Sequence, residues 1–449
     1  MRASAGTNRK NRLHVPVRRC AGYVFFALLL TGCDSGSDEE GMPSRSLLPQ
    51  VPLTAYVSDS PYADVLEDCV KAPSEAASCS LQELPLVMDD VALDEVPSVA
   101  VIMDHVTVSH PWMGMRFRQA LEEMPSAIRS LMQPVTAIVI ASDIRPSFYF
   151  AGTGAIYLDP AQLWLREDEK DSVDQTPDYR QGFGDDLNFA PLARFVSGNE
   201  RAWEHYYLDE PGTRTLDDIV KPLAALLFHE LAHANDFFPP AIIDSLDRDQ
   251  KPSHLADSVH SESVMAQLLD EDDGEPLTST RLMELALVRY RGETATPAMI
   301  ALDAEEVGTE FEPDGAAMDY AYNSGYEDVA TLFEEVMMKH YFNVDREVAY
   351  ADLTDKPTND CADYLIGWGV RHRIGAPQVK RRAEFVVQRL LGQSDVSNYF
   401  DTIPEPQPLT LGVDWCDVDS LGDVSMASVQ SKTTKQKRIP PSDFGMGYR

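Results

Sequence analysis

Basic residues are scarce in this chain. The 449 residues include 38 lysines and arginines against 73 aspartates and glutamates, which gives a formal net charge of −35. An acidic surface of this kind repels phosphate backbones, and this argues against nucleic acid as a partner. At 44% hydrophobic residues, the chain can nevertheless bury a substantial core, enough for two or three subdomains.

The N-terminus also lacks a long apolar run. Residues 1–19 contain six basic residues and no acidic one, and the apolar run that follows spans only 21–30. This run is too short to cross a bilayer but has the length of a signal-peptide core. It ends in Leu-Thr-Gly-Cys at Cys33, which resembles the lipobox of bacterial lipoproteins, where the signal peptidase cuts before a cysteine that carries lipid.

This resemblance implies a signal peptide over residues 1–32 and a lipid anchor at Cys33. An ordinary secretory signal with an unrelated cysteine is the alternative. Removal of the signal would leave 32 basic against 73 acidic residues, a charge of −41. The resemblance places the chain in the cell envelope, facing the periplasm or the exterior, while the choice of membrane and the oligomeric state stay open.

Cysteine is another scarce residue, with six in the chain. Cys20 lies within the predicted signal and Cys33 is the predicted lipid site, so four remain. An even number in an exported chain predicts two disulfides. Because their members lie in the same regions, we favour two of the possible pairs: Cys69–Cys79 and Cys361–Cys416.

The most informative stretch spans residues 228–236 and contains a His-Glu-x-x-His motif. On a helix, residues four apart share one face, so His229 and His233 can direct two imidazoles at one point. This is the spacing at which two histidines bind Zn²⁺, with Glu230 placed to act as general base on a water. Asp236 lies on the same face and would orient a ligand histidine, form a salt bridge or cap a helix.

The surrounding sequence supports a helix. Leu223, Leu227 and Leu231 fall on the side opposite the histidines, which predicts a buried back face. Pro222 is acceptable in a first turn, and Pro239 should end the helix soon after the motif.

A catalytic zinc ion that is bound by two histidines needs a third protein ligand. The best candidate for this ligand lies about a hundred residues downstream. In the helical pattern around residues 326–336, Glu327 and Glu334 share the face opposite the apolar side chains. We expect Glu327 to be the third ligand, and Glu334 is the alternative. Ser324-x-x-Glu327 could instead be a simple capping box.

The motifs together resemble one family. The chain contains His-Glu-Leu-Ala-His-Ala-x-Asp from His229 to Asp236 and, further on, Glu-x-x-Ala-x-x-Phe from Glu327 to Phe333. This combination resembles the gluzincin metallopeptidases, and among them the group similar to the catalytic domain of anthrax-toxin lethal factor. The resemblance implies that Glu327 is the third zinc ligand. It also implies that the tyrosine seven residues earlier, Tyr320, helps to stabilise the oxyanion.

One position departs from the family pattern. Many gluzincins carry an acidic residue four positions after the ligand, where this chain has Thr331. Tyr322 and Tyr326 are alternatives to Tyr320.

The predicted fold class is α+β. After an N-terminal extension (53–95), which follows a flexible tether (33–52), we expect an α/β zincin-like subdomain with a small mixed sheet over 96–237. It includes a helix at 116–132, a strand at 135–140 and a hairpin of 148–150 with 155–158. One strand of this hairpin would lie at the edge of the sheet and bind extended substrate. A mostly α-helical subdomain (238–422) and a disordered tail (423–449) should follow.

These patterns predict a zinc-dependent endopeptidase that acts on protein or peptide substrates. The zinc would lower the pKa of a bound water towards 7, and Glu230 would take its proton. Two alternatives stay open: a non-proteolytic lipoprotein that binds zinc or a partner on a zincin scaffold, and a zinc hydrolase of cell-wall peptides or other amides.

Overall fold

The computed structural model describes residues 48–72, 78–92, 95–270, 274–353, 361–392 and 397–416. The predicted signal peptide, Cys33 and the predicted tail lie outside these residues, as does most of the tether. All the described residues belong to one compact unit. Within the described ranges, no helix is both long enough and apolar enough to cross a membrane.

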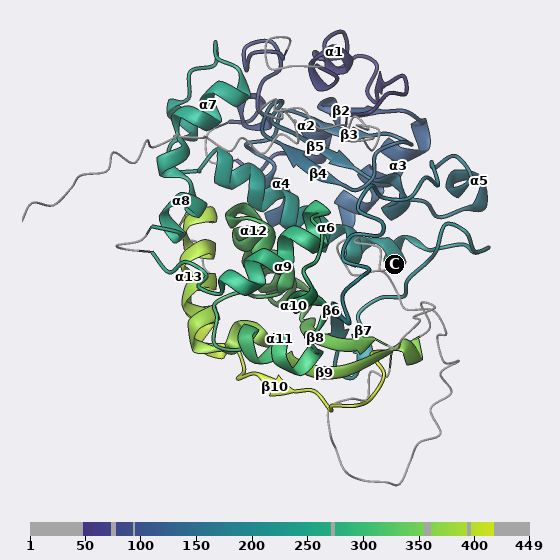
Figure 1. The fold of residues 1–449 in the computed structure, drawn as a ribbon. Helices are drawn as coiled ribbons and strands as arrows, with labels where there is room; N and C mark the ends of the chain where they lie inside the picture. Colours follow the sequence, from purple (N-terminus) through teal and green to yellow (C-terminus); the bar gives the residue numbers. More distant parts are fainter. Residues whose placement is uncertain are drawn as a thin grey trace, which may run out of the picture. The chain divides into compact units, whose positions relative to one another are not determined.

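A five-stranded mixed sheet forms the first half of this unit (Figure 1). Its strand order is β1-β2-β3-β5-β4; β2, β3 and β5 run parallel, and β1 and β4 pair antiparallel at the two edges. The strands are β1 (Thr54–Ala55), β2 (Val106–Val108), β3 (Ile138–Ile140), β4 (Phe148–Phe150) and β5 (Ala155–Leu158).

Side chains alternate between the two faces of this sheet, as the period of a strand requires. Ile138 and Ile140 of β3 belong to the main core, while Val139 between them packs on the opposite side with the N-terminal extension. The helices of this half are α1 (Leu66–Val70), α2 (Val99–Asp104), α3 (Pro111–Glu123), α4 (Ser126–Leu131) and α5 (Glu167–Lys170). The predicted helix at 116–132 is thus two helices, α3 and α4, separated at Pro125.

A second five-stranded sheet, entirely antiparallel, has the order β10-β9-β8-β6-β7. Its strands are β6 (Phe189–Ser197), β7 (Glu200–Arg201), β8 (Asp345–Leu353), β9 (Tyr364–Arg371) and β10 (Gln407–Pro408). β6 precedes the motif helix in the chain, whereas β8 follows all the predicted zinc ligands. The sheet therefore joins two parts of the sequence that we assigned to different subdomains.

Helices fill the chain between β7 and β8. They are α6 (Leu216–Phe237), α7 (Pro252–Ser258), α8 (Val264–Leu268), α9 (Thr280–Arg291), α10 (Pro297–Ile300), α11 (Ala304–Phe311) and α12 (Gly325–Phe342), with α13 (Pro377–Leu390) after β9. α12 packs along α6, and α13 packs on the far side of α12 (Figure 1). α11 lies against β8 and β9.

The fold class is α+β, as predicted, but the expected mostly helical subdomain over 238–422 needs a correction. Helices predominate only as far as Phe342, and β8 and β9 then form the centre of the second sheet. The region 166–214, in which we predicted no strand, supplies β6.

The cysteines pair as we favoured. Cys69 and Cys79 form one disulfide of the N-terminal extension, and Cys361 and Cys416 form the other, which ties the start of β9 to the last described residues.

Candidate metal centre

The motif helix α6 is defined at both ends by its sequence. Thr215 is the N-cap: its hydroxyl accepts the backbone N–H of Asp218, whose carboxylate accepts the N–H of Thr215 at 2.7 Å. The helix ends at Phe237, immediately before Phe238-Pro239. It begins earlier than we predicted, at Leu216, so Pro222 lies inside the helix rather than in its first turn.

α6 is buried on nearly all sides. Leu223, Leu227 and Leu231 are fully buried in the main core, as the periodicity predicted. The opposite face, which carries the motif, is also covered, and His229 and Glu230 are each only 4% exposed. A metal here would be held in a largely water-excluded site.

α12 brings the third predicted ligand to this face. The hydroxyl of Ser324, its N-cap, accepts the backbone N–H of Glu327 at 3.2 Å. This is half of the capping box that was the alternative reading of Glu327. The carboxylate of Glu327 turns towards the histidines of α6, so the residue both begins the helix and contributes to the site.

His229, His233 and Glu327 offer three ligand atoms that all lie within 4.8 Å of one another. Oε2 of Glu327 is 2.9 Å from Nε2 of His229 and 3.5 Å from Nε2 of His233. Tetrahedral zinc with bonds of about 2.0–2.1 Å would place its ligand atoms roughly 3.3 Å apart. The two distances to Glu327 lie on either side of this value, so the three side chains are gathered closely enough to be candidate ligands of one ion.

The electrostatics of the three residues are strongly coupled. Burial alone would lower the pKa of His229, but the Glu327 and Glu334 carboxylates outweigh burial and raise this pKa to about 10. Burial opposes the ionised form of Glu327, yet the two imidazoles hold its pKa well below the usual range. The carboxylates of the site thus stabilise a positive charge on the imidazoles between them. A bound metal cation would supply such a positive charge in place of the protons.

Glu230 lies between the histidines and the edge of the first sheet. Burial raises the pKa of its carboxyl group, while the neighbouring imidazoles and the backbone N–H of Tyr149 in β4 oppose this rise. A carboxyl group with a raised pKa is suited to exchange a proton near neutral pH. The contact with Tyr149 also places the edge strand β4 beside the candidate centre, where we expected a substrate-binding strand.

Of the three tyrosines considered, Tyr320 adjoins the ligands. It lies in a short 3-10 helix, Asp319–Asn323, and its hydroxyl donates to Oε1 of Glu327 at 3.2 Å. Tyr322 instead donates to Asp314, and the ring of Tyr326 stacks on Phe237. The spacing of seven residues therefore selects the tyrosine that contacts the ligand carboxylate.

Glu334, our reserve ligand, lies behind His229. Its Oε2 is 3.5 Å from Nδ1 of His229, a contact longer than a regular hydrogen bond. Metal-binding histidines commonly direct the other ring nitrogen at a carboxylate, which fixes the ring and its tautomer. Glu334 is in place for this role, and Thr331, where the family pattern has an acid, instead donates to the carbonyl of Asp328.

Arg346 was not among the predicted site residues. This arginine of β8 donates to Oε1 of Glu334 at 2.5 Å and is fully buried. Only the pairing of β8 with β6 brings it to the back of α12, so no local pattern could have identified it.

Asp236 occupies a different place from the one that its spacing suggested. Oδ1 accepts the backbone N–H of Met265 at 3.0 Å and so joins α6 to α8. Within the part of the chain that the structure describes, no hydrogen bond links it to a histidine. Burial raises the pKa of Asp236 to about 6, while the N–H of Met265 and the charge of His233 oppose this rise.

The chain was compared with protein-family models, curated proteins and solved structures, and none of them matches it.

Proposed function

We propose that this chain is a zinc-dependent endopeptidase with a zincin-like catalytic unit, anchored in the cell envelope through lipid at Cys33. The observation that supports the metal is the convergence of His229, His233 and Glu327 from two separate helices, with their ligand atoms all within 4.8 Å of one another. The lipid anchor is supported by the sequence alone.

Zinc, when bound, would acidify a coordinated water and polarise the carbonyl of the scissile amide. The chain's own residues supply the remaining steps. Glu230 takes the proton of the attacking water and delivers it to the leaving amine, for which its raised pKa suits it. Tyr320 donates its hydroxyl to the carbonyl oxygen as negative charge develops there.

β4 would position the substrate. It is the edge strand of the first sheet, and the contact between Tyr149 and Glu230 places it beside the general base. An extended peptide paired with this edge would lie across the centre.

The metal content of the full chain tests the proposal. We expect about one zinc per chain by elemental analysis, a strong loss in Glu327→Ala and retention in Glu334→Ala. Glu230→Gln should keep the metal and lose hydrolysis of a denatured protein substrate. A folded wild-type chain that binds no zinc would overturn the proposal, and hydrolysis by Glu230→Gln at the wild-type rate would favour a non-proteolytic role for the site.

A further inference from the structure

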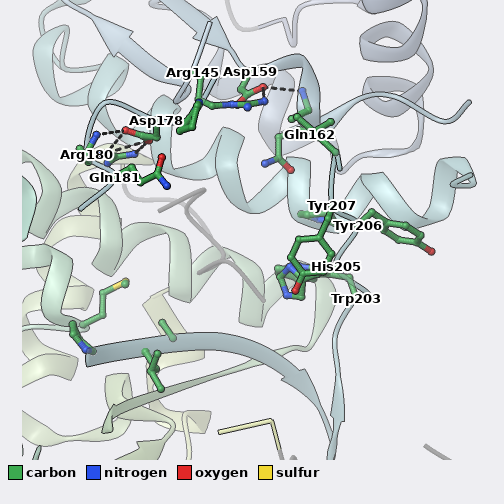
Figure 2. Close-up of a pocket in the computed structure, with 18 of the residues that line it drawn as sticks. Arg145, Asp159, Gln162, Asp178, Arg180, Gln181, Trp203, His205, Tyr206 and Tyr207 are labelled. Carbon is green, nitrogen blue, oxygen red and sulfur yellow. Dashed lines mark hydrogen bonds and ion pairs between the residues drawn. The ribbon is translucent and has the colours of Figure 1, made fainter. Parts of the chain in front are cut away.

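A cavity of about 520 Å³ lies beside the candidate centre (Figure 2). The loop segments around Asp159, Arg180 and Tyr206 form one part of its wall. The rest comes from β6, β8, the N-terminal half of α6, the end of α9, the end of α11 and residues 318–319. Its volume is typical of ligand sites and exceeds that of a single amino-acid side chain.

Tyr320 lies between the candidate metal ligands and residues that line the cavity. The hydroxyl of Tyr320 contacts Glu327, while its ring packs edge-on against Tyr290 with the ring centroids 4.9 Å apart. Tyr290 and Asp319, the residue before Tyr320, both line the cavity. The proposed oxyanion donor thus stands between the ligands and this space.

The cavity lies against one face of the motif helix α6. Asp218 and Pro222 line it and lie eleven and seven residues before His229. At about 100° per residue, both fall within roughly 20° of His229 around the helix. The cavity thus contacts the metal-binding face of α6 between Asp218 and Pro222. From Asp218, at the far end of this contact, to His229 the helix rises about 16 Å, at 1.5 Å per residue. An extended peptide covers this length with about five residues, at roughly 3.3 Å each.

The charged groups of the inner wall neutralise one another. Arg145 pairs with Asp159 at 2.9 Å and Arg180 with Asp178 at 2.5 Å, as Figure 2 shows. Asp319 is bound by Arg289 at 3.2 Å and also accepts hydrogen bonds from two tyrosine hydroxyls. These carboxylates and guanidinium groups are already engaged, so a charged ligand would lose its hydration without gaining a partner.

The rest of the wall combines an apolar floor with polar side chains, such as Gln162 and His205, and has an acidic outer part. Buried apolar side chains form the floor: Leu192, Ala193, Phe311, Met318, Val348 and Tyr350. Near the start of α6, Glu204 and Asp209 line the cavity and are exposed to solvent. The whole wall carries four arginines and six acidic residues, so an acidic ligand would be disfavoured throughout.

We infer that this cavity binds an extended polypeptide segment of about five residues to one side of the scissile bond, rich in apolar or aromatic side chains and free of acidic ones. This inference rests on the proposed peptidase function and specifies its substrate class. It predicts an enzyme that acts on long, exposed chain segments and handles short peptides poorly.

The test measures binding separately from hydrolysis. The zinc-loaded, full-chain Glu230→Gln variant would be titrated calorimetrically with apolar peptides whose two termini are blocked. The peptides range from a dipeptide to an octapeptide, and two series extend the chain on one or the other side of the same central bond. We expect affinity to rise with length on one side until about five added residues and then to level off. A glutamate within that segment should weaken binding at least ~10-fold, and a lysine should weaken it less.

Two tryptophan substitutions give a matched pair. Ala161 lines the cavity from a short 3-10 helix, Pro160–Gln162, and is partly exposed, so Ala161→Trp should fill the space without disturbing a core. It should weaken binding of long peptides by about 10-fold or more and leave the dipeptide unchanged. Ala301→Trp, at an exposed position outside the cavity, should bind as the parent does. Metal content and melting temperature would verify that both variants fold.

The outcomes separate the two claims. Affinity that does not depend on length, or that Ala161→Trp leaves unchanged, would overturn the cavity inference even if the wild-type chain cleaves these peptides. A second outcome is that binding depends on peptide length and is weakened by Ala161→Trp, but the wild-type chain cleaves none of the peptides. This outcome would support peptide binding in the cavity and overturn the peptidase proposal.

Discussion

Arg346 donates a hydrogen bond to Glu334 in the interior of the protein, and neither side chain is more than 1% exposed. The other carboxylate oxygen of Glu334 faces Nδ1 of His229. A strand of the second sheet is thus connected through two side chains to a predicted metal ligand. Glu334 is therefore placed to orient the ring of His229 if that residue binds a metal.

Glu334→Gln should weaken zinc binding without abolishing it. Loss of a carboxylate behind a ligand histidine typically reduces metal affinity by about 10–100-fold, because the ring loses its fixed orientation. Competition against a zinc-binding dye would measure the change. Glu335→Gln is the matched control, since Glu335 is equally buried on the same helix but is not directed at a ligand. Equal affinities for Glu334→Gln and the wild type would contradict this role.

Arg346→Met should destabilise the fold strongly. Removal of the guanidinium group leaves the buried charge of Glu334 without its partner, a change that typically costs about 3–5 kcal/mol in the free energy of unfolding. Denaturant titration of the metal-free protein would measure it, and the double variant with Glu334→Gln should recover part of the loss. Arg381→Ala breaks the exposed pair with Glu275 and should change stability by less than ~1 kcal/mol. Similar losses in both arginine variants would contradict the argument.

Tyr320→Phe should reduce kcat while leaving KM and zinc content close to the wild type. A hydrogen-bond donor to a developing oxyanion typically contributes about 10²–10³-fold to kcat. Steady-state kinetics on a peptide substrate would give both constants. Tyr326→Phe, whose ring stacks on Phe237, should leave kcat unchanged. If zinc is lost together with activity in Tyr320→Phe, the hydroxyl serves mainly to hold Glu327.

Stability should depend on pH through Glu335. Burial raises the pKa of this carboxyl group to about 7 in the folded chain, although the charge of Arg346 opposes the rise. A pKa above the unfolded value means that the folded state binds the proton more tightly. This contribution is complete below about pH 4.5 and is lost as the pH rises through about 7, by up to roughly 3 kcal/mol.

Glu335→Gln, which cannot ionise, tests this dependence. The variant should gain stability relative to the wild type between about pH 5 and pH 8. Denaturant unfolding of both proteins across this range would reveal the difference. A difference in stability that stays constant with pH would show that Glu335 does not titrate there.

The sequence could predict the parts of the candidate centre that depend on helical spacing. His229 and His233 lie four residues apart, and Glu334 lies two turns after Glu327, so each pair shares a face wherever its helix lies. Spacing could not decide which glutamate faces Nε2 of His229 and which faces Nδ1. That assignment depends on how α12 lies along α6.

β6 shows why the second sheet was missed. Its sequence contains Pro191 and Arg194, and proline in a run argues against a central strand. In the structure, β7 pairs only with Val196 and Ser197, so the first half of β6 is an edge on that side and tolerates a residue without an N–H. Arg194 is buried because Glu347 on the adjacent strand pairs with it, a contact between residues far apart in the chain.

The antiparallel pairing of β6 with β8 places Val196 opposite Asp345. The segment between them contains His229, His233 and Glu327, and it begins and ends at neighbouring points of one sheet. The two ends of this segment therefore leave the second sheet side by side, while its helices α6 and α12 pack in the core that the first half of the chain also forms. The pairing of two distant strands thus closes the segment that carries all three candidate ligands, and the rest of the chain supplies the core around it.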